Sequence, residues 1–242
     1  RASGLGSSAA LSAAVGAAMH RLANPGKGID RDGLSALAHR AEAHAQQGRA
    51  SPMDASTSVE GGIVVLSDHV EVDANHLYTR QLMTPEGKRT WEVHNLAAPS
   101  DDVYLVLGNT GVFAPTSKQV AMVADALAVD PSRVREIEAI GTVARRGLAA
   151  LMEGDYEAVG HAMSENHLLL RSLGVSSPEL ENLIQAAAPT SLGVKLTGAG
   201  GGGCMVALTR HPKQTSEAIE LAGGRTLVSR IGNDGVRIET AT

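Results

Sequence analysis

The chain has 242 residues, of which 43% are hydrophobic and 19% charged, and its formal net charge at pH 7 is -5. This composition is typical of a globular protein with a sizeable core, and the acidic balance gives no electrostatic support for nucleic-acid binding. A single cysteine excludes an intrachain disulfide, and no apolar run approaches the roughly 20 residues that span a membrane.

Two helices are predicted near the start of the chain. Apolar residues recur at helical spacing over 8–22, and Ser8 lies at the N-terminal end of this apolar stripe. A second helix is predicted over 33–47, with Glu42 at the flank of its apolar face. The stripe of the first helix consists of Leu11, Val15, Ala18, Met19 and Leu22.

The remaining elements change from mostly strands to mostly helices along the chain. The Gly-, Ser- and Pro-containing segment 48–54 predicts a loop, and this loop carries Asp54. Strands are predicted at 61–66, 76–83, 90–94, 103–108, 193–196 and 203–209, and near 226–231 and 235–240. Helices are predicted over 116–128, 130–151, 155–173, 178–188 and 214–223. This partly segregated mixture indicates an α+β protein, with a domain boundary near 110–115.

Two glycine-rich segments are the main functional signals. The first, residues 4–10, opens a helix, so its backbone N–H groups and the helix dipole favour an anion. It matches neither the Walker A pattern nor the dinucleotide fingerprint, and a tight turn capped by serine remains the alternative. The second segment, 198–203, holds five glycines in six positions, each costing roughly 0.5–1 kcal/mol relative to alanine when ordered. Apolar strands on both sides favour a functional loop over a flexible linker.

Several single residues have a chemical and a structural interpretation. Asp54 can accept a proton from an acceptor hydroxyl, and Glu42 can coordinate Mg²⁺, a cation that prefers oxygen ligands. Either one, taken alone, is better explained as an ordinary surface carboxylate. His161 and His167 lack metal-ligand spacing and are expected at the helix surface or in hydrogen bonds, while Cys204 is expected to be a small buried residue.

These motifs resemble those of the GHMP kinases, a superfamily that includes galactokinase, homoserine kinase and mevalonate kinase. Residues 4–10 resemble the second motif of the superfamily, and residues 195–204 resemble its third motif. The segment 48–62, with Asp54 followed by Gly-Gly, looks like that of the mevalonate kinases. Residues 109–112 and 165–167 look like those of archaeal mevalonate kinases, so the resemblance covers essentially the whole chain.

The resemblance implies a two-domain GHMP kinase fold. Residues 1–112 would form the remainder of the N-terminal ATP-binding domain, which is ribosomal protein S5 domain 2-like, and residues 113–242 a ferredoxin-like α/β C-terminal domain. The family opens with a strand carrying a Pro-Gly-Lys-like motif that this chain does not contain. We therefore expect an N-terminally truncated fragment that is inactive or nearly so by itself.

The resemblance also implies the reaction and the site. It implies ATP-dependent phosphorylation of the primary hydroxyl of mevalonate to 5-phosphomevalonate in isoprenoid biosynthesis, with Asp54 as the catalytic aspartate. Ser8 and Glu42 would bind Mg²⁺, with some risk of a one-residue register error at Glu42. ATP would contact Gly4, Leu5, Gly6, Ser7, Ser8 and Ala9. Substrate would contact Thr116, Gly198, Ala199 and Gly200, with the third motif packed beside the first loop.

Other functions remain open at this stage. Phosphomevalonate kinase or a mevalonate 3-kinase is the alternative within the family. An acceptor that is already phosphorylated should require further Lys or Arg residues near the pocket, and Arg49 is the one basic residue in the Asp54 loop, so this alternative is not favoured. A non-catalytic GHMP-fold binding protein is the alternative outside enzymes, but the chain retains the carboxylate and the glycine segments that such a protein is expected to lose. We expect a cytoplasmic location, a small-molecule substrate, a possible homodimer, and neither nucleic-acid nor membrane partners.

Overall fold

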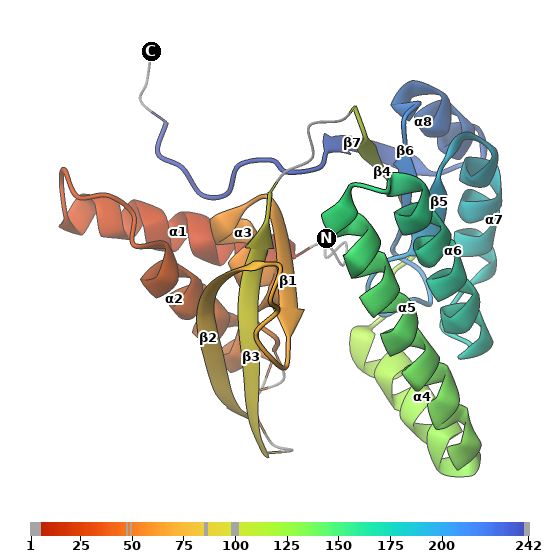
Figure 1. Cartoon of the computed structure of the whole chain (residues 1–242), viewed down its shortest axis with the longest axis horizontal. Coiled ribbons are helices and arrows are strands. Elements are labelled where there is room, and N and C mark those ends of the chain that lie inside the picture. Colours follow the sequence, from red (N-terminus) through yellow and green to blue (C-terminus); the bar gives the residue numbers. More distant parts are fainter. Residues whose placement is uncertain (1–5, 47, 49, 85–86, 98–101, 240–242) are drawn as a thin grey trace. The chain divides into compact units, whose positions relative to one another are not determined.

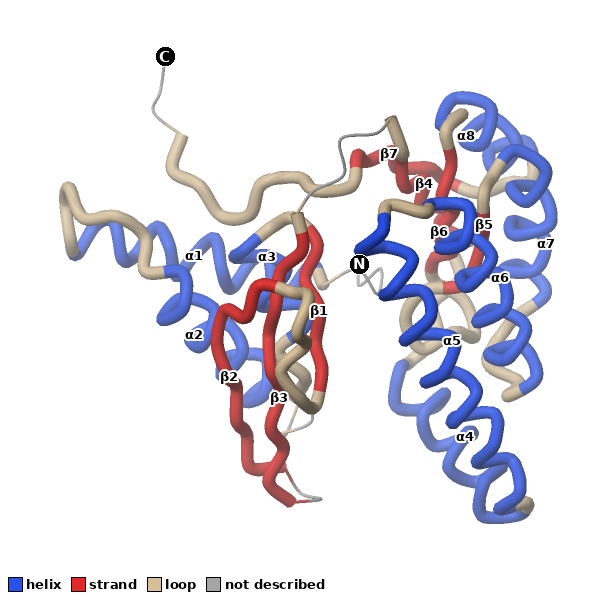
Figure 2. The backbone as a smooth tube through the Cα atoms, in the orientation of Figure 1, coloured by secondary structure: helices blue, strands red, loops and turns tan. Residues whose placement is uncertain are grey.

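The computed structural model describes residues 6–46, 48, 50–84, 87–97 and 102–239, without the side chains of Thr116 and Ser117. Runs of helices and runs of antiparallel strands follow one another along the chain (Figure 1 and Figure 2), so the predicted α+β class is confirmed. The chain forms two compact units, and each is described by itself. The first unit comprises 6–97 together with 231–239, and the second comprises 102–230.

The first unit combines three helices with a small antiparallel sheet. Its elements are α1 (Ser7–Ala23), α2 (Arg31–Ala45), α3 (Met53–Glu60), β1 (Ile63–Ser67), β2 (Asn75–Thr84) and β3 (Gly87–Leu96). The strand order is β1-β3-β2, with antiparallel pairing throughout. Its core is built from small and aliphatic side chains of the three helices, namely Ala13, Ala17, Leu34, Ala38, Ala55 and Val59.

Polar contacts fix the sheet to α2 and α3. The Tyr78 hydroxyl of β2 donates to Ser35 Oγ of α2 at 3.0 Å and to Glu60 Oε1 of α3 at 3.2 Å. The ring of Trp91 on β3 meets His39 of α2 edge-on, with centroids 5.9 Å apart. These contacts hold α2 and α3 against one face of the sheet, and α2 and α3 carry the two predicted site carboxylates.

The apolar stripe predicted for the first helix is not the buried face of α1. Leu11, Met19 and Leu22 are 66%, 65% and 81% exposed, whereas Ala9, Ala13, Gly16 and Ala17 are buried. A Cβ on Gly16 would lie 2.7 Å from Leu34 Cδ1, so α1 and α2 are too close for larger side chains between them. The small residues therefore form the contact, and the larger apolar residues remain outside it.

The second unit has ferredoxin-like topology. Its elements are β4 (Tyr104–Asn109), α4 (Thr116–Val129), a 3₁₀ turn (Pro131–Arg133), α5 (Val134–Glu153), α6 (Tyr156–Ser172), α7 (Pro178–Ala187), a second 3₁₀ turn (Ala188–Thr190), β5 (Gly193–Leu196), β6 (Cys204–Thr209), α8 (Pro212–Leu221) and β7 (Arg225–Arg230). The strand order β5-β6-β4-β7 is that of a split β-α-β-β-α-β motif, with every pair antiparallel. Residues of α7 and α8 pack on one face of this sheet in a core that includes Leu180, Leu183, Ile219, Leu196 and Met205.

Two predicted elements are corrected by the structure. Met53–Glu60 is a helix that begins directly after Pro52, so Asp54 lies in the first turn of α3 and not in a loop. The strand predicted at 235–240 is absent from its described part, 235–239, and an isolated bridge between Gly61 and Asp234 lies just before it. A backbone contact with α3 holds this segment instead of strand pairing: Val236 N donates to Val59 O at 3.0 Å.

The predicted family domains, 1–112 and 113–242, have different boundaries from the two compact units. The units divide between 97 and 102, and residues 231–239 return to the first unit. The boundary at 112/113 stays a prediction about the family's domains.

Candidate functional site

The N-terminus of α1 has the features of an anion site. Gly6 precedes the helix with φ 68°, a left-handed conformation that favours glycine, and as the N-cap residue it has no side chain to bond the first-turn N–H groups. The first turn contains no acidic residue, so no carboxylate within it competes with an anion for the free N–H groups of Ser7 and Ser8. Ala9 is fully buried and anchors the turn. Of the other predicted phosphate contacts, Gly4 and Leu5 lie outside the described residues.

Ser8 and Glu42 come together although 34 residues separate them. Ser8 Oγ donates to Glu42 Oε2 at 2.8 Å, and Glu42 on α2 is only 8% exposed. Gln46 Nε2 donates to the same carboxylate oxygen at 3.3 Å. The sequence interpretation missed Gln46, although its position one helical turn after Glu42 was a usable signal. Together, Ser8 and Glu42 present two oxygen ligands from different helices.

Asp54 adjoins both the first glycine segment and this carboxylate. A Cβ on Gly6 would lie 3.1 Å from Asp54 Cγ, so only glycine allows so close an approach. Partial burial, and the charge of Glu42 in second place, raise the pKa of Asp54 above its ordinary value of 3.8. Gly6, Ser8, Glu42 and Asp54 thus form one group in the first unit.

The second glycine segment is an ordered loop in the second unit. Gly198, Gly200, Gly201 and Gly203 all have φ between 72° and 83°. Gly203 N donates to Val112 O at 2.9 Å, Gly201 N donates to Val175 O at 2.7 Å, and Thr197 N donates to Cys204 O at 3.0 Å. These bonds make it a closed loop between β5 and β6 and argue against an open linker.

Of the substrate residues predicted in this unit, Gly198, Ala199 and Gly200 belong to that loop, and Thr116 begins α4. A Cβ on Gly201 would lie 2.2 Å from Gln119 Nε2 of α4, so the first turns of α4 adjoin the glycine loop. The side chain of Thr116 is outside the described part, and its role stays a prediction. The predicted packing of this loop beside the first glycine segment also stays a prediction.

Two neighbours of the glycine loop have shifted pKa values. Burial lowers the pKa of Lys195, the third residue of β5. Burial also raises the pKa of the Cys204 thiol, and Cys204 is 2% exposed, as expected for a small buried residue. The thiol is therefore protonated near neutral pH and is a poor nucleophile.

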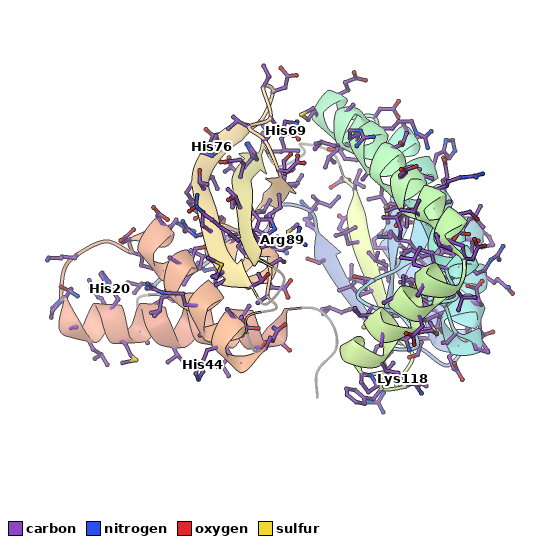
Figure 3. All side chains as sticks on the ribbon, turned by 90° about the horizontal axis from the view of Figure 1, so that it is seen from below. His20, His44, His69, His76, Arg89 and Lys118 are labelled. Atoms are coloured by element: carbon purple, nitrogen blue, oxygen red, sulfur yellow. The ribbon has the colours of Figure 1, made fainter. Side chains whose placement is uncertain are left out.

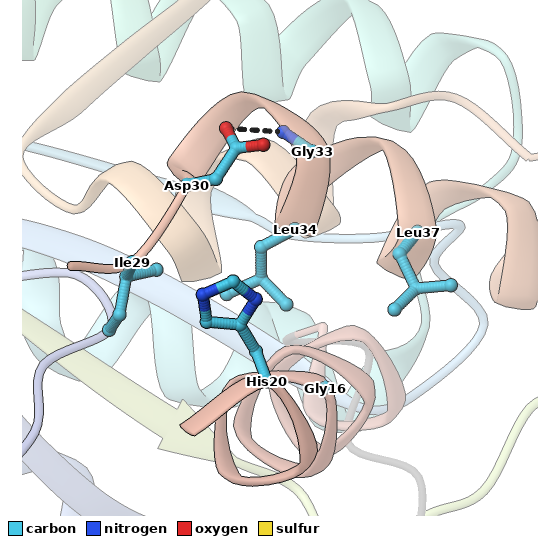
Figure 4. A pocket seen from close by; sticks show the side chains of 7 residues that line it. All are labelled: Gly16, His20, Ile29, Asp30, Gly33, Leu34 and Leu37. Atoms are coloured by element: carbon cyan, nitrogen blue, oxygen red, sulfur yellow. Dashed lines mark hydrogen bonds between the residues drawn. The ribbon is translucent and has the colours of Figure 1, made fainter. Parts of the chain in front are cut away.

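Four histidines and a cavity of the first unit are further features of the structure. His20, His44, His69 and His76 project from separate elements (Figure 3), and within the described ranges no three His, Cys, Asp or Glu side chains are arranged to hold a metal ion. A cavity of about 140 Å³ between α1 and α2 is lined by Gly16, His20, Ile29, Asp30, Gly33, Leu34 and Leu37 (Figure 4). The Asp30 side chain already caps α2 through Gly33 N at 3.0 Å. This cavity contains none of the predicted site residues.

Family comparisons match both ends of the chain. The profile described as GHMP kinases N terminal domain matches residues 1–62, and the profile described as GHMP kinases C terminal matches residues 148–223. The chain belongs to the GHMP kinases. The first glycine segment of this GHMP kinase lies within the N-terminal match and the second within the C-terminal match.

Individual relatives are mevalonate kinases. Mevalonate kinase of Pyrococcus furiosus is 32% identical over 244 residues, which cover 98% of this GHMP kinase chain and 65% of the relative. Mevalonate kinase of Pyrococcus horikoshii is 34% identical with the same coverage. The crystal structure of L. major mevalonate kinase in complex with R-mevalonate matches with a TM-score of 0.70 and 26% identity, over 92% of this chain and 62% of that chain. The predicted GHMP kinase fold and the resemblance to archaeal mevalonate kinases are confirmed.

The chain spans about 65% of the length of these two archaeal relatives. In the described part of this GHMP kinase, no helix combines the length and apolar character needed to cross a bilayer.

Proposed function

We propose that the protein carrying this chain transfers the γ-phosphoryl group of ATP to the primary hydroxyl of mevalonate. Its similarity to mevalonate kinases along 98% of the chain supports this substrate. The observation that carries the proposal is the convergence of Asp54, Glu42 and Ser8 beside the N-terminus of α1. Phosphoryl transfer requires a positioned phosphate, cation ligands and a carboxylate at the nucleophile, and this group offers all three.

Asp54 is proposed to act on the acceptor. Its carboxylate accepts the proton of the mevalonate hydroxyl as that oxygen attacks the γ-phosphorus, and ADP leaves with the electrons of the broken P–O bond. The N–H groups of Ser7, Ser8 and Ala9 would hold phosphate oxygens at the positive end of the α1 dipole. Because the pKa of Asp54 is raised, its basicity is greater than that of an ordinary aspartate.

Ser8 and Glu42 fit a magnesium site. Mg²⁺ in kinases is typically held by one or two protein oxygens together with substrate phosphates, and it neutralises the charge that develops during transfer. The Ser8 hydroxyl and the Glu42 carboxylate lie 2.8 Å apart next to the helix N-terminus, where such phosphates would bind. Gln46 would keep the Glu42 carboxylate oriented while the ion is bound.

Turnover in the protein that carries this chain tests the proposal. Mevalonate should be phosphorylated in preference to phosphomevalonate, galactose and homoserine, and D54N should lower kcat by about 10²–10⁴-fold, the usual share of a general base. D32N is the matched control, because Asp32 lies in the same unit and pairs with Arg80 on the sheet. Turnover that survives in D54N would remove Asp54 from the chemistry, and preference for phosphomevalonate would favour the sibling kinase.

Further parts of the proposal rest on the resemblance alone. They are a cytoplasmic location and a homodimer.

A further inference from the structure

A buried histidine of the second unit has no role in the proposed reaction. His167 on α6 is 4% exposed, and both of its ring nitrogens have partners. Leu196 N donates to Nδ1 at 3.4 Å, and Nε2 lies 3.0 Å from Glu181 Oε1 of α7. A backbone N–H can only donate, so Nδ1 carries the lone pair and Nε2 carries the proton. The neutral imidazole therefore links the backbone of β5 to the Glu181 carboxylate.

Glu181 gathers further partners on the same carboxylate. Ser176 Oγ donates to Oε1 at 2.5 Å, and Arg171 Nη1 lies 3.6 Å from Oε2. Burial acts to raise the pKa of Glu181, but the hydrogen bond from Ser176 and the contacts with His167 and Arg171 outweigh it and lower the pKa. Glu181 is thus ionised at neutral pH and holds donors from α6 and from the α6–α7 connection.

Both of these connections lead to the glycine loop. Leu196, which donates to His167, ends β5 two residues before Gly198. Val175, next to Ser176, accepts a hydrogen bond from Gly201 N at 2.7 Å. A Cβ on Gly200 would lie 2.0 Å from Val175 O, so the loop packs directly on this backbone. One carboxylate is therefore linked to the start of the loop and to its middle.

We propose that Glu181 is a positioning residue for the glycine loop 198–203, acting through His167 at the start of the loop and through Ser176 at its middle. This inference rests on the proposed function and on the family resemblance, by which Gly198, Ala199 and Gly200 would contact the substrate. Glu181 itself makes no contact with substrate in this account. Its effect is to fix the loop backbone in the conformation that the reaction needs.

The charged groups around His167 agree with this role. Glu181 faces it from α7, Arg171 from its own helix and Lys195 from β5. Burial is the main cause that lowers the pKa of His167, so the ring stays neutral and Nδ1 remains an acceptor for Leu196 N near neutral pH.

The test compares E181Q with E179Q in the full-length protein. Both variants remove one negative charge from the first turn of α7, but Glu179 is exposed and makes none of these contacts. We expect faster hydrogen exchange over 196–204 in E181Q and a fall in kcat/KM of about ten- to a hundredfold, the scale of a small displacement of a positioned group. E179Q should match the parent in both measurements. S176A, which removes a single hydroxyl, gives the same comparison should E181Q fail to fold.

Conservative replacement of the histidine separates positioning from simple packing. The amide of H167Q can accept from Leu196 N and donate to Glu181, whereas H167A can do neither. We expect H167Q to retain most of the exchange protection over 196–204 and most of kcat/KM, and H167A to lose both.

Each outcome is decisive. Equal exchange in E181Q and E179Q overturns the inference, and so does an H167Q variant that behaves like H167A. Faster exchange with unchanged kcat/KM also overturns it, because the loop would then be positioned without consequence for the reaction. A failed proposed function would instead appear in the parent protein, as absence of mevalonate phosphorylation with the exchange difference intact.

Discussion

The close approach of Gly6 to Asp54 can be tested by adding a single methyl group at position 6. An alanine at position 6 would have to keep φ at 68° and would place its Cβ 3.1 Å from Asp54 Cγ. The left-handed conformation costs a non-glycine residue about 1–2 kcal/mol. We expect G6A to lose that much stability and also to lose about 10²-fold in kcat/KM, because the methyl displaces the carboxylate.

G26A is the matched control for this substitution. Gly26 has φ 87° in the same unit, and nothing lies within 4 Å of its Cβ position. Its variant should show the same loss of stability with unchanged kcat/KM. Thermal melts and steady-state kinetics of the two variants decide the matter, and equal kinetics in both would separate Gly6 from the site.

The raised pKa of Asp54 predicts opposite effects on stability and activity. The unfolded carboxyl ionises near its ordinary value of 3.8, and the folded one ionises at higher pH. Its contribution to stability is therefore full below pH 3.8 and is lost as pH rises through the folded pKa. At neutral pH the carboxylate lowers the free energy of unfolding, so D54N should melt slightly above the parent while its turnover falls.

Melting curves between pH 3 and 8 check this sign. The gain in Tm of D54N should be present at pH 7 and should disappear toward pH 3, where the parent is protonated as well. In the parent, kcat/KM should fall as pH drops through the raised pKa of Asp54, because the base must be ionised. A D54N variant that melts below the parent at pH 7 contradicts the assignment.

At the scale of elements, periodicity predicted most helices and strands but missed α3. Residues 53–60 contain Ser, Thr and Asp, which favour caps and turns over helix interiors, and they follow Pro52. Tertiary contacts stabilise this short helix. Its carbonyl at Val59 accepts from Val236 N and from Arg31 Nη1, and both partners are remote in sequence. Such contacts are invisible to a local pattern.

The buried face of α1 was missed for a related reason. A pattern assigns large apolar residues to the core, but the distance between α1 and α2 selects small ones at Gly16 and Ala13. The helix itself was predictable, whereas the pattern placed Glu42 only at the flank of the apolar face of α2, and its burial is a finding of the structure. Family resemblance assigned Ser8 and Glu42 to the same Mg²⁺ ion, but the hydrogen bond between them was not predicted, since neither residue has a local signal for the other.

At the scale of the whole molecule, two segments that are far apart in the sequence build the first unit. Residues 231–239 return to it after the whole of the second unit, and they cross α3 with almost no space between the backbones. A Cβ on Gly61 would lie 2.1 Å from Gly235 N, and Arg31 Nη2 donates to Val236 O at 3.1 Å. The C-terminal segment thus secures the helix whose first turn carries Asp54.

This crossing predicts a selective effect of G235A. Its Cβ would lie 2.2 Å from Val59 O, so the segment must separate from α3, at a cost of about 1–3 kcal/mol. Gly28, with nothing within 4 Å of its Cβ position, gives the control G28A. Trp91, the single tryptophan, meets the ring of His39 edge-on within the first unit, so its fluorescence follows that unit during melting. The midpoint of the fluorescence melting curve should fall in G235A and not in G28A. Hydrogen exchange over 53–60 should be faster in G235A than in G28A. Equal midpoints in the two variants would show that the crossing contributes nothing to the stability of α3.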